Sequence, residues 1–371
     1  MNNSLTWVEI NAKNLLHNLA EFRKIIPSHV KIMAVVKANA YGHGIKEVGK
    51  VISSKVDWFG VNNLEEALIL KEIGVQKPIL ILGYTPLSQL EEVAENGFRQ
   101  VVYNQGTIIK SIKTLNVHLK VETGMNRQGI DKREILNFVK LAQRCPSVKI
   151  EGIYTHLADT EDETNQNFTR KQLATFKEIV NLLEENGFDI PLKHTANTAA
   201  AILFPEAYFD LIRLGIGMHG LWPAESVKEK AKRLGIKINL RPVLTWKTQV
   251  AQIKKVKKGE TIGYGCAFKA TKDSKIAVLA AGYFDGYTRK FFKCGEVLIG
   301  GKKASVVGRI CMNMIMVDIT EIPDVKLEQE VVLLGKQGKN EITAEDLAEK
   351  IGTNNYEIVT RINPLISRQV V

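Results

Sequence analysis

The chain has 371 residues, of which 45% are hydrophobic and 25% charged, a composition typical of a globular protein with a substantial core. No run of apolar residues reaches the ~18 that a membrane-spanning helix needs, and the N-terminus lacks a charged segment leading into an apolar one. We therefore expect no membrane partner and no export. The formal net charge is +11, but the lysines are interleaved with acids and lack an adjacent aromatic platform, which argues against a nucleic-acid partner.

The four cysteines, Cys145, Cys266, Cys294 and Cys311, form neither a CxxC pair nor a dense disulfide pattern. Widely spaced cysteines of this kind are typical of reduced thiols in a cytoplasm. The sequence therefore predicts a cytoplasmic protein, and it suggests no metal site.

Short apolar runs alternate with helical-looking segments from Lys31 to about Leu221. The apolar runs are Ile32–Val36, Trp58–Val61, Ile79–Leu82, Gln100–Tyr103, Val117–Val121, Ile150–Thr155, Leu192–Thr195 and Leu211–Leu214. Eight such runs separated by amphipathic stretches predict an α/β fold with a (β/α)₈ TIM barrel. We assign residues 10–234 to this barrel.

After about Leu234 the pattern changes to short β-rich runs divided by glycine and lysine turns. The runs are Val243–Ile253, Ile276–Ala281, Glu296–Ile299, Ser305–Val307, Ile315–Ile319 and Val331–Leu334. They predict a mainly antiparallel β domain over residues 235–371, interrupted by one helix, Thr343–Ile351, with Thr343 and Asp346 spaced as a capping box. Residues 1–9, which begin a strand signal at Thr6–Ile10, are expected to pair with this domain.

Lys37 stands where a buried apolar strand meets a small-residue loop. A lysine desolvated at such a position has a lowered pKa and becomes a nucleophile for carbonyl groups, including the aldehyde of pyridoxal phosphate. The alternative is a lysine whose ammonium group simply reaches solvent from a strand end.

Other polar residues follow later strands of the predicted barrel, whose C-terminal strand ends line the active site in this fold. Taken singly, each has a structural explanation as a core histidine, a loop cation or a helix N-cap. Their recurrence at equivalent strand ends favours a shared site. These residues are Arg127, His156, Asn197, Thr198 and Arg213.

Several segments together resemble the alanine racemase family. Ala34–Gly44, which contains Val36-Lys37-Ala38-Asn39, is similar to the family's pyridoxal-phosphate attachment segment. Glu122–Gly129, His194–Ala200 and Arg213–Gly220 resemble three further family segments in the barrel. In the second domain Gly263–Gly265, Gly282–Tyr287, Gly308–Met312 and Asn355–Glu357 match in order.

The resemblance implies pyridoxal 5'-phosphate as cofactor, a small amino acid as substrate and a homodimer whose active site is shared between subunits. It implies cofactor binding by Lys37, Tyr41, Arg127, His156, Asn197, Thr198, Arg213, Gly215, Ile216 and Tyr356. It implies substrate contacts by Arg127, Tyr283 and Met312. It implies no metal.

The resemblance also implies the reaction. Racemisation removes a proton from one face of Cα and delivers another to the opposite face, so two groups must flank that carbon. Lys37 and Tyr264 are the implied pair, with His156 tuning Tyr264. Arg213 faces the pyridine nitrogen in the racemases, whereas the related decarboxylases place an acid there. We therefore expect an enzyme that racemises L-alanine to D-alanine for peptidoglycan.

Two alternatives remain open: a broad-specificity or serine racemase of the same fold, and a non-catalytic pyridoxal-phosphate carrier. The first is raised by departures from the family pattern at His219, Asn313 and Asn354, and Thr198 replaces the usual serine. The second would have no use for Tyr264 or Arg213. Lys120 matches a lysine that some family members carry as a carbamate, and the sequence does not decide whether it is modified here.

Overall fold

A computed structural model describes residues 4–161 and 166–371, which divide into two compact units. One unit comprises Lys13–Ala40 and Val48–Arg241, and the other comprises Pro242–Val371 with Tyr41–Glu47 and the described part of Met1–Ala12. The short segment Tyr41–Glu47, directly after the Lys37 loop, thus groups with the C-terminal unit.

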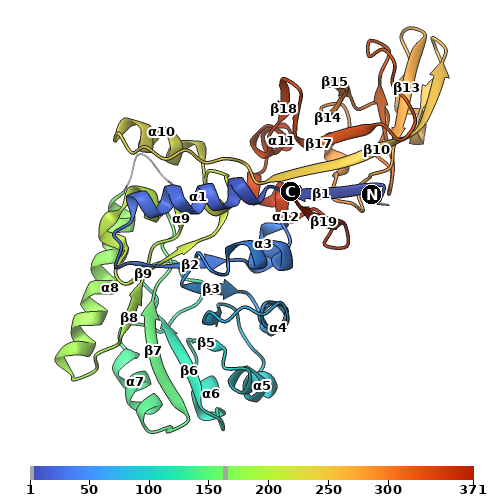
Figure 1. Cartoon of the computed structure of the whole chain (residues 1–371). Helices are drawn as coiled ribbons and strands as arrows, with labels where there is room; N and C mark the ends of the chain where they lie inside the picture. The colour runs from blue at the N-terminus through green and yellow to red at the C-terminus, as the bar shows by residue number, and fades with distance from the viewer. Residues whose placement is uncertain (1–3, 162–165) are drawn as a thin grey trace. The chain divides into compact units, whose positions relative to one another are not determined.

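The first unit is built on an eight-stranded parallel sheet in the order β8-β7-β6-β5-β4-β3-β2-β9 (Figure 1). Its strands are β2 (Lys31–Val35), β3 (Trp58–Val61), β4 (Ile79–Ile81), β5 (Arg99–Val102), β6 (Leu115–Lys120), β7 (Val148–Tyr154), β8 (Leu192–His194) and β9 (Leu211–Leu214). Two backbone hydrogen bonds join the terminal strands β8 and β9, from the amide of Asp210 to the carbonyl of Lys193 and from Arg213 to Ala196. The predicted barrel is therefore confirmed, nearly closed.

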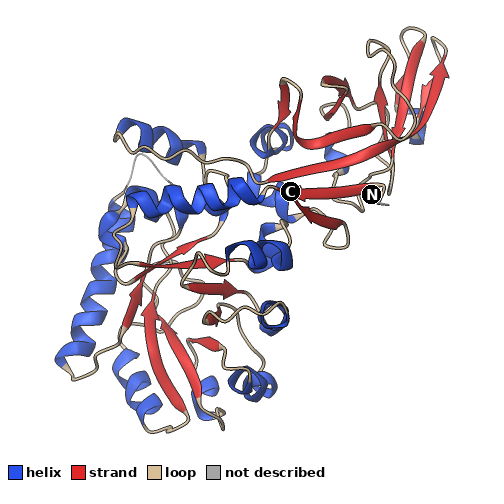
Figure 2. Ribbon diagram, viewed as in Figure 1, coloured by secondary structure: helices blue, strands red, loops and turns tan. Residues whose placement is uncertain are grey.

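The longer helices of this unit lie outside its sheet, as Figure 2 shows. The helical segments between residues 12 and 233 are α1 (Ala12–Ile25), α2 (Lys37–Tyr41, a left-handed turn), α3 (Ile45–Ile52, whose first residues belong to the other unit), α4 (Leu64–Glu72), α5 (Leu90–Glu95), α6 (Gln105–Ile109), α7 (Ile135–Gln143), α8 (Asn167–Glu185), α9 (Thr198–Leu203) and α10 (Glu225–Arg233), with 3-10 turns η1 (Leu87–Gln89), η2 (Pro205–Ala207) and η3 (Ile216–His219). Their apolar faces pack on strands that are buried on both sides, which explains why the strands read as continuous apolar runs.

The C-terminal unit contains a mainly antiparallel nine-stranded sheet, as predicted, in which only the β1–β19 pairing is parallel. Its strands are β1 (Thr6–Ile10), β10 (Leu244–Val256), β13 (Ser274–Leu279), β14 (Glu296–Ile299), β15 (Lys302–Ser305), β16 (Ile315–Asp318), β17 (Glu330–Gln337), β18 (Asn340–Ile342) and β19 (Ser367–Val370), beside a hairpin of β11 (Thr261–Ile262) and β12 (Phe268–Lys269). The strand signal at the N-terminus forms β1, which pairs with β10.

Two of the secondary-structure predictions for this unit need correction. The structure has two helices, α11 (Ala344–Ile351) and α12 (Asn355–Thr360), where one was predicted, together with 3-10 turns η4 (Tyr264–Cys266) and η5 (Arg289–Phe291). Gly352, in the left-handed conformation, ends α11, and the side chain of Asn354 caps α12. The strand predicted at Ser305–Val307 begins earlier, since β15 spans Lys302–Ser305, and Val306 continues it only as an isolated antiparallel bridge to Val317. The predicted capping box of Thr343 and Asp346 is present.

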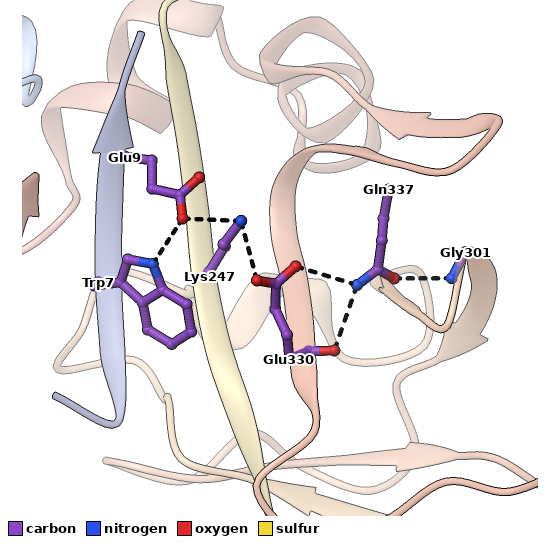
Figure 3. A network of polar contacts seen from close by, with 6 residues as sticks. All are labelled: Trp7, Glu9, Lys247, Gly301, Glu330 and Gln337. Carbon is purple, nitrogen blue, oxygen red and sulfur yellow. Dashed lines mark hydrogen bonds and ion pairs between the residues drawn. The ribbon is translucent and has the colours of Figure 1, made fainter. Parts of the chain in front are cut away.

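A polar network crosses three strands of this unit (Figure 3). The ammonium group of Lys247 in β10 bridges two carboxylates, Glu9 in β1 at 2.9 Å and Glu330 in β17 at 3.0 Å. Because a one-residue slip of either neighbour would turn its carboxylate to the other face of the sheet, the network specifies the register of the N-terminal strand. The remaining members of the network are Trp7, Gln337 and Gly301.

Candidate active site

Lys37 follows β2 and begins a single turn of left-handed backbone. Ala38, Asn39 and Ala40 have φ of 53°, 54° and 51°, and Tyr41 has φ of 54°. Left-handed backbone costs roughly 1–2 kcal/mol for each residue with a Cβ atom, and consecutive residues of this kind are concentrated at functional sites. Hydrogen bonds hold the turn, from the Asn39 amide to Glu66 Oε1 at 3.2 Å and from the Ala40 amide to the Val36 carbonyl at 2.8 Å. The turn therefore presents Lys37 in a defined position at the strand end.

The ammonium group of Lys37 is half-buried among other cations. Burial lowers its pKa, and the charges of Arg127 and Arg213 lower it further, while Glu66 partly opposes them. A lowered pKa increases the fraction of neutral amine, which is the nucleophilic form. This agrees with the expectation drawn from the strand-to-loop position.

Arg213 in β9 is 4% exposed and surrounded by acceptors. Its Nη1 donates to Nδ1 and to the carbonyl of His194, at 2.9 and 3.2 Å. Its Nη2 donates to the carbonyls of Thr155 and Thr195, at 3.0 and 2.8 Å, and to Nδ1 of His156 at 3.2 Å. Its guanidinium carbon lies 5.0 Å from the ring centre of Tyr154. The guanidinium is thus held by groups from β7, β8 and the residues that directly follow these two strands.

His156, just after β7, is a neutral imidazole in this environment. Burial places its pKa well below the ordinary value, and the positive charges of Arg213 and Arg127 act in the same direction. Since a guanidinium can only donate, Nδ1 of His156 accepts from Arg213 and its proton resides on Nε2. His156 therefore offers an N–H donor at Nε2.

Thr198, Gly215 and Ile216 form a group of small donors at the ends of β8 and β9. The Gly215 amide donates to Thr198 Oγ1 at 3.2 Å. A Cβ atom on Gly217 would lie 2.5 Å from Cγ2 of Thr198, so only glycine lets η3 approach the threonine this closely. Asn197 supports the group by capping α9, its Oδ1 accepting from the Ala200 amide at 2.9 Å.

Lys120 in β6 adds a buried cation to the same region. Burial, followed by the charges of Arg127 and Arg213, lowers its pKa to about 8. Its ammonium group donates to Oε1 of Gln128 at 3.0 Å. Arg127 itself lies in the exposed loop after β6. The carboxylates acting on these cations are Glu66 and Glu122, so the cluster carries an excess of positive charge.

The C-terminal unit contains the other predicted site residues. The rings of Tyr41 and Tyr356 lie 6.1 Å apart at 50°. Tyr264, Tyr283 and Met312 have exposed side chains, at 71%, 40% and 56%. Backbone hydrogen bonds from Tyr283 to Cys311 and from Phe284 to Met312 hold two of these segments together.

The structure brings the predicted barrel residues together and adds residues that the sequence analysis missed as site residues. Lys37, Arg127, His156 and Arg213 act on one another electrostatically. The missed residues are Glu66, His118, Tyr154 and His194, which contact Arg213, each other or the Lys37 turn. Two signals were available: side-chain alternation along β6 places His118 on the same face as Lys120, and His194 begins one of the segments that resemble the family.

Two further expectations concern membrane-spanning helices and disulfide bonds. No helix within 4–161 and 166–371 is long and apolar enough to cross a membrane. The four cysteines are free thiols.

Comparisons with known proteins cover nearly the whole chain. The alanine racemase N-terminal domain family matches residues 10–223, and the alanine racemase C-terminal domain family matches residues 243–370. The alanine racemase of Halothermothrix orenii is 40% identical, with 98% of this chain and 96% of the relative covered. The alanine racemase of Methanococcus maripaludis is 38% identical, with 98% and 97% covered.

Solved structures agree. An alanine racemase of Clostridium difficile 630 superposes with a TM-score of 0.93 at 35% identity, with 100% of this chain and 97% of that chain covered. The alanine racemase of Bacillus anthracis with bound L-Ala-P gives a TM-score of 0.93 at 36% identity, with 100% and 96% covered. The chain belongs to the alanine racemase family.

Proposed function

We propose that this protein interconverts L-alanine and D-alanine with pyridoxal 5'-phosphate, supplying D-alanine for peptidoglycan in the cytoplasm. The observation that carries the proposal is Lys37, whose pKa is lowered by burial and which faces Arg127 and Arg213 at the end of a barrel strand. Membership of the alanine racemase family supports the reaction and the cofactor.

The donor set fits a cofactor of this chemistry. Pyridoxal phosphate carries a phosphate and a phenolic oxygen, both anionic, and the cluster around Lys37 has an excess of cations. The Thr198 hydroxyl with the Gly215 and Ile216 amides would hold the phosphate, together with Tyr41 and Tyr356. Arg127 and His156 would contact the ring, and Asn197 supports the phosphate group through Thr198. When bound through Lys37, the cofactor supplies an electron-withdrawing system that acidifies the α-hydrogen of an amino acid.

Arg213 favours racemisation among the reactions that such a cofactor permits. A guanidinium remains charged and gives up no proton at neutral pH, so an arginine facing the ring nitrogen leaves that nitrogen unprotonated. Three carbonyls and two imidazoles hold Arg213 in place, which prevents it from turning aside. This arrangement limits the charge that the ring accepts and so disfavours side reactions.

Two proton-transferring groups would serve opposite faces of the α-carbon. Lys37 is one, because its lowered pKa increases the fraction of neutral amine that can accept a proton. Tyr264 is the other, contributed by the second subunit of a homodimer together with the substrate contacts Tyr283 and Met312. The exposure of Tyr264 at 71% and Met312 at 56% supports a role toward a partner. The Nε2–H of His156 would donate to the Tyr264 oxygen and stabilise its ionised form.

A complementation experiment tests the shared site. Lys37→Ala and Tyr264→Phe proteins are each expected to lack racemase activity. If the site takes Lys37 from one subunit and Tyr264 from the other, half of a randomly reassembled mixture is hybrid and each hybrid has one intact site. The mixture should then recover about a quarter of the wild-type activity. No recovery from a mixture shown to contain hybrids would place both residues in one chain.

A racemase of broader specificity is the second candidate. It was suggested by three positions that differ from the family pattern, His219, Asn313 and Asn354, and their exposure differs. His219 is fully buried, and Asn354 caps α12 by accepting from the Glu357 amide at 3.0 Å. Asn313, exposed next to Met312, is the departure that can meet a substrate. Chiral chromatography after incubation with L-alanine, L-serine and L-lysine separates the two candidates, and a carrier without activity would convert none.

A further inference from the structure

Two buried histidines lie behind Arg213 in the barrel interior, and the proposed reaction assigns them no part. His118 in β6 and His194 in β8 are both 0% exposed. Nδ1 of His118 lies 2.9 Å from Nε2 of His194, and the rings meet edge to face. Burial lowers the pKa of both, and the charge of Arg213 acts in the same direction; Glu151 raises the pKa of His118 but does not outweigh its burial, so the neutral form of both imidazoles is favoured.

The hydrogen bonds between these groups can run in only one direction. Arg213 is donor-only, so Nδ1 of His194 must accept its N–H and the His194 proton sits on Nε2. That Nε2–H donates to His118 Nδ1, which leaves the His118 proton on Nε2. Because each neutral imidazole accepts at Nδ1, it must donate from Nε2, and so the donor Arg213 fixes the proton position of both histidines.

The far end of this chain is a carboxylate. Oε2 of the partly buried Glu151 in β7 lies 3.8 Å from Nε2 of His118, which is longer than a hydrogen bond, so the carboxylate faces this N–H without accepting it directly. Burial would raise the pKa of Glu151, but its contacts with His118 and Arg99 outweigh this and lower the pKa to about 2. Glu151 is therefore acceptor-only. Within the described residues Nε2 of His118 has no partner at hydrogen-bond distance, and Glu151 is the carboxylate that it faces.

The surroundings fit an imidazole at position 118. A Cβ atom on Gly152 would lie 2.5 Å from Nδ1 of His118, so glycine is needed beside the ring. Trp58 packs edge-on against the other side, with ring centres 5.3 Å apart. Arg99 covers Trp58 and forms an ion pair with Glu151 at 3.0 Å. The His118 ring is thus held in one orientation.

We propose that His194, His118 and Glu151 are positioning residues for Arg213: two hydrogen bonds run in one direction from Arg213 through His194 to His118, and the Glu151 carboxylate faces the N–H at their end. The donor-only guanidinium and the acceptor-only carboxylate impose the same direction from opposite ends. A donor at position 151 would oppose that direction, because His118 or His194 would then turn an N–H toward another N–H. The assignment rests on the proposed function only in that Arg213 serves the cofactor ring.

The test compares substitutions that keep a hydrogen-bond acceptor at position 151 with one that puts a donor there. Glu151→Gln retains an acceptor oxygen, and Arg99→Gln removes the ion pair while leaving the carboxylate. Both should preserve the Nε2–H forms of His118 and His194, with kcat within about twofold of wild type. Glu151→Lys imposes a donor and should lower kcat roughly tenfold at nearly constant KM for L-alanine, since Arg213 serves the cofactor and not the substrate.

The ring nitrogens are read directly by ¹⁵N NMR of the holoenzyme labelled at histidine, with His118→Phe to assign the signals. His118→Phe also removes the acceptor of His194 Nε2–H and should lower kcat in the same way, which covers the case that Glu151→Lys does not fold. A proton on Nδ1 of His194 in the wild-type protein would contradict the proposed hydrogen-bond direction. A folded Glu151→Lys protein with the kcat of Glu151→Gln would contradict it as well. If the Nε2–H forms are found but the wild-type protein does not racemise alanine, the proposed hydrogen-bond arrangement is supported and the proposed function is contradicted.

Discussion

Arg213 donates from Nη2 to Nδ1 of His156 at 3.2 Å, and this contact decides which nitrogen of His156 carries the proton. The same guanidinium donates from Nη1 to Nδ1 of His194 at 2.9 Å. One arginine therefore fixes the proton positions of two histidines in opposite directions, one toward the proposed reaction and one into the barrel.

Replacing this arginine tests its planar geometry separately from its charge. Arg213→Lys keeps the cation but cannot donate to both imidazoles and three carbonyls, so several buried acceptors lose their partners. We expect kcat for L-alanine to fall by about a hundredfold, the cost of losing hydrogen bonds to a charged group. Steady-state kinetics measure the effect, and Arg144→Lys on the exposed surface is the matched control. Equal kinetics for the two variants would remove Arg213 from the site.

Lys37 should carry the cofactor covalently. Borohydride reduction followed by peptide mass spectrometry should place the added mass on Lys37, because its lowered pKa makes it the nucleophile of the cluster. Lys37→Ala should lower racemisation by about a thousandfold or more. Lys31→Ala, at the exposed start of the same strand, is the control and should remain active. An adduct on a different lysine would contradict the central assignment.

Loss of the Tyr264 hydroxyl should have a directional effect. Tyr264→Phe should lose exchange of the α-hydrogen of L-alanine into heavy water far more than that of D-alanine, since Lys37 and Tyr264 serve opposite faces. Overall racemisation must fall equally in both directions, because the equilibrium constant between enantiomers is fixed. Tyr84→Phe, an exposed tyrosine of the barrel unit, is the control. Equal losses would reject a face-specific role, and selective loss from D-alanine would reverse the two faces.

The fully buried His118 and His194, together with the partly buried His156, should make the fold sensitive to acid. His118, His156 and His194 have folded-state pKa values below the ordinary 6.5, mainly through burial. As the pH falls below about 6.5, the unfolded chain binds protons that the folded chain does not, so stability is present above this pH and is lost below it.

The free energy of unfolding should fall by roughly 1.4 kcal/mol per pH unit for each of these histidines. Urea unfolding between pH 7 and pH 5 measures the slope, and His118→Phe should reduce it by one proton. His29→Gln, on the exposed surface, is the matched control. A slope equal in His118→Phe and wild type would mean that His118 is charged in the folded protein.

Gly152 should be intolerant of even a methyl group. Gly152→Ala places Cβ 2.5 Å from Nδ1 of the buried His118, which must shift. Overpacking of this kind typically costs about 1–3 kcal/mol of unfolding free energy. Urea denaturation measures it, with Gly106→Ala as the control, because a Cβ there has no neighbour nearer than 3.6 Å. Equal stability of the two variants would show that the His118 ring has room to move.

The positions of the strands along the sequence, and the position of Lys37 at a strand end, could be predicted because both depend on a local pattern of residues. Doubly buried parallel strands read as apolar runs, so all eight barrel strands were predicted within a few residues. The capping box at Thr343 and Asp346 depends on a spacing of three residues. By contrast α12, of six residues, has too few positions to show a helical period and was missed.

The sequence by itself determined the barrel, the antiparallel unit and the family, and it predicted Lys37 as the reactive lysine. Only the tertiary structure decided the charge and proton position of each group. His118 and His194 are 76 residues apart in the chain yet share a hydrogen bond, and Arg213 meets His156 across 57 residues. Local spacing carries no information on such pairs, since burial and the direction of a hydrogen bond arise only when distant strands close around one interior.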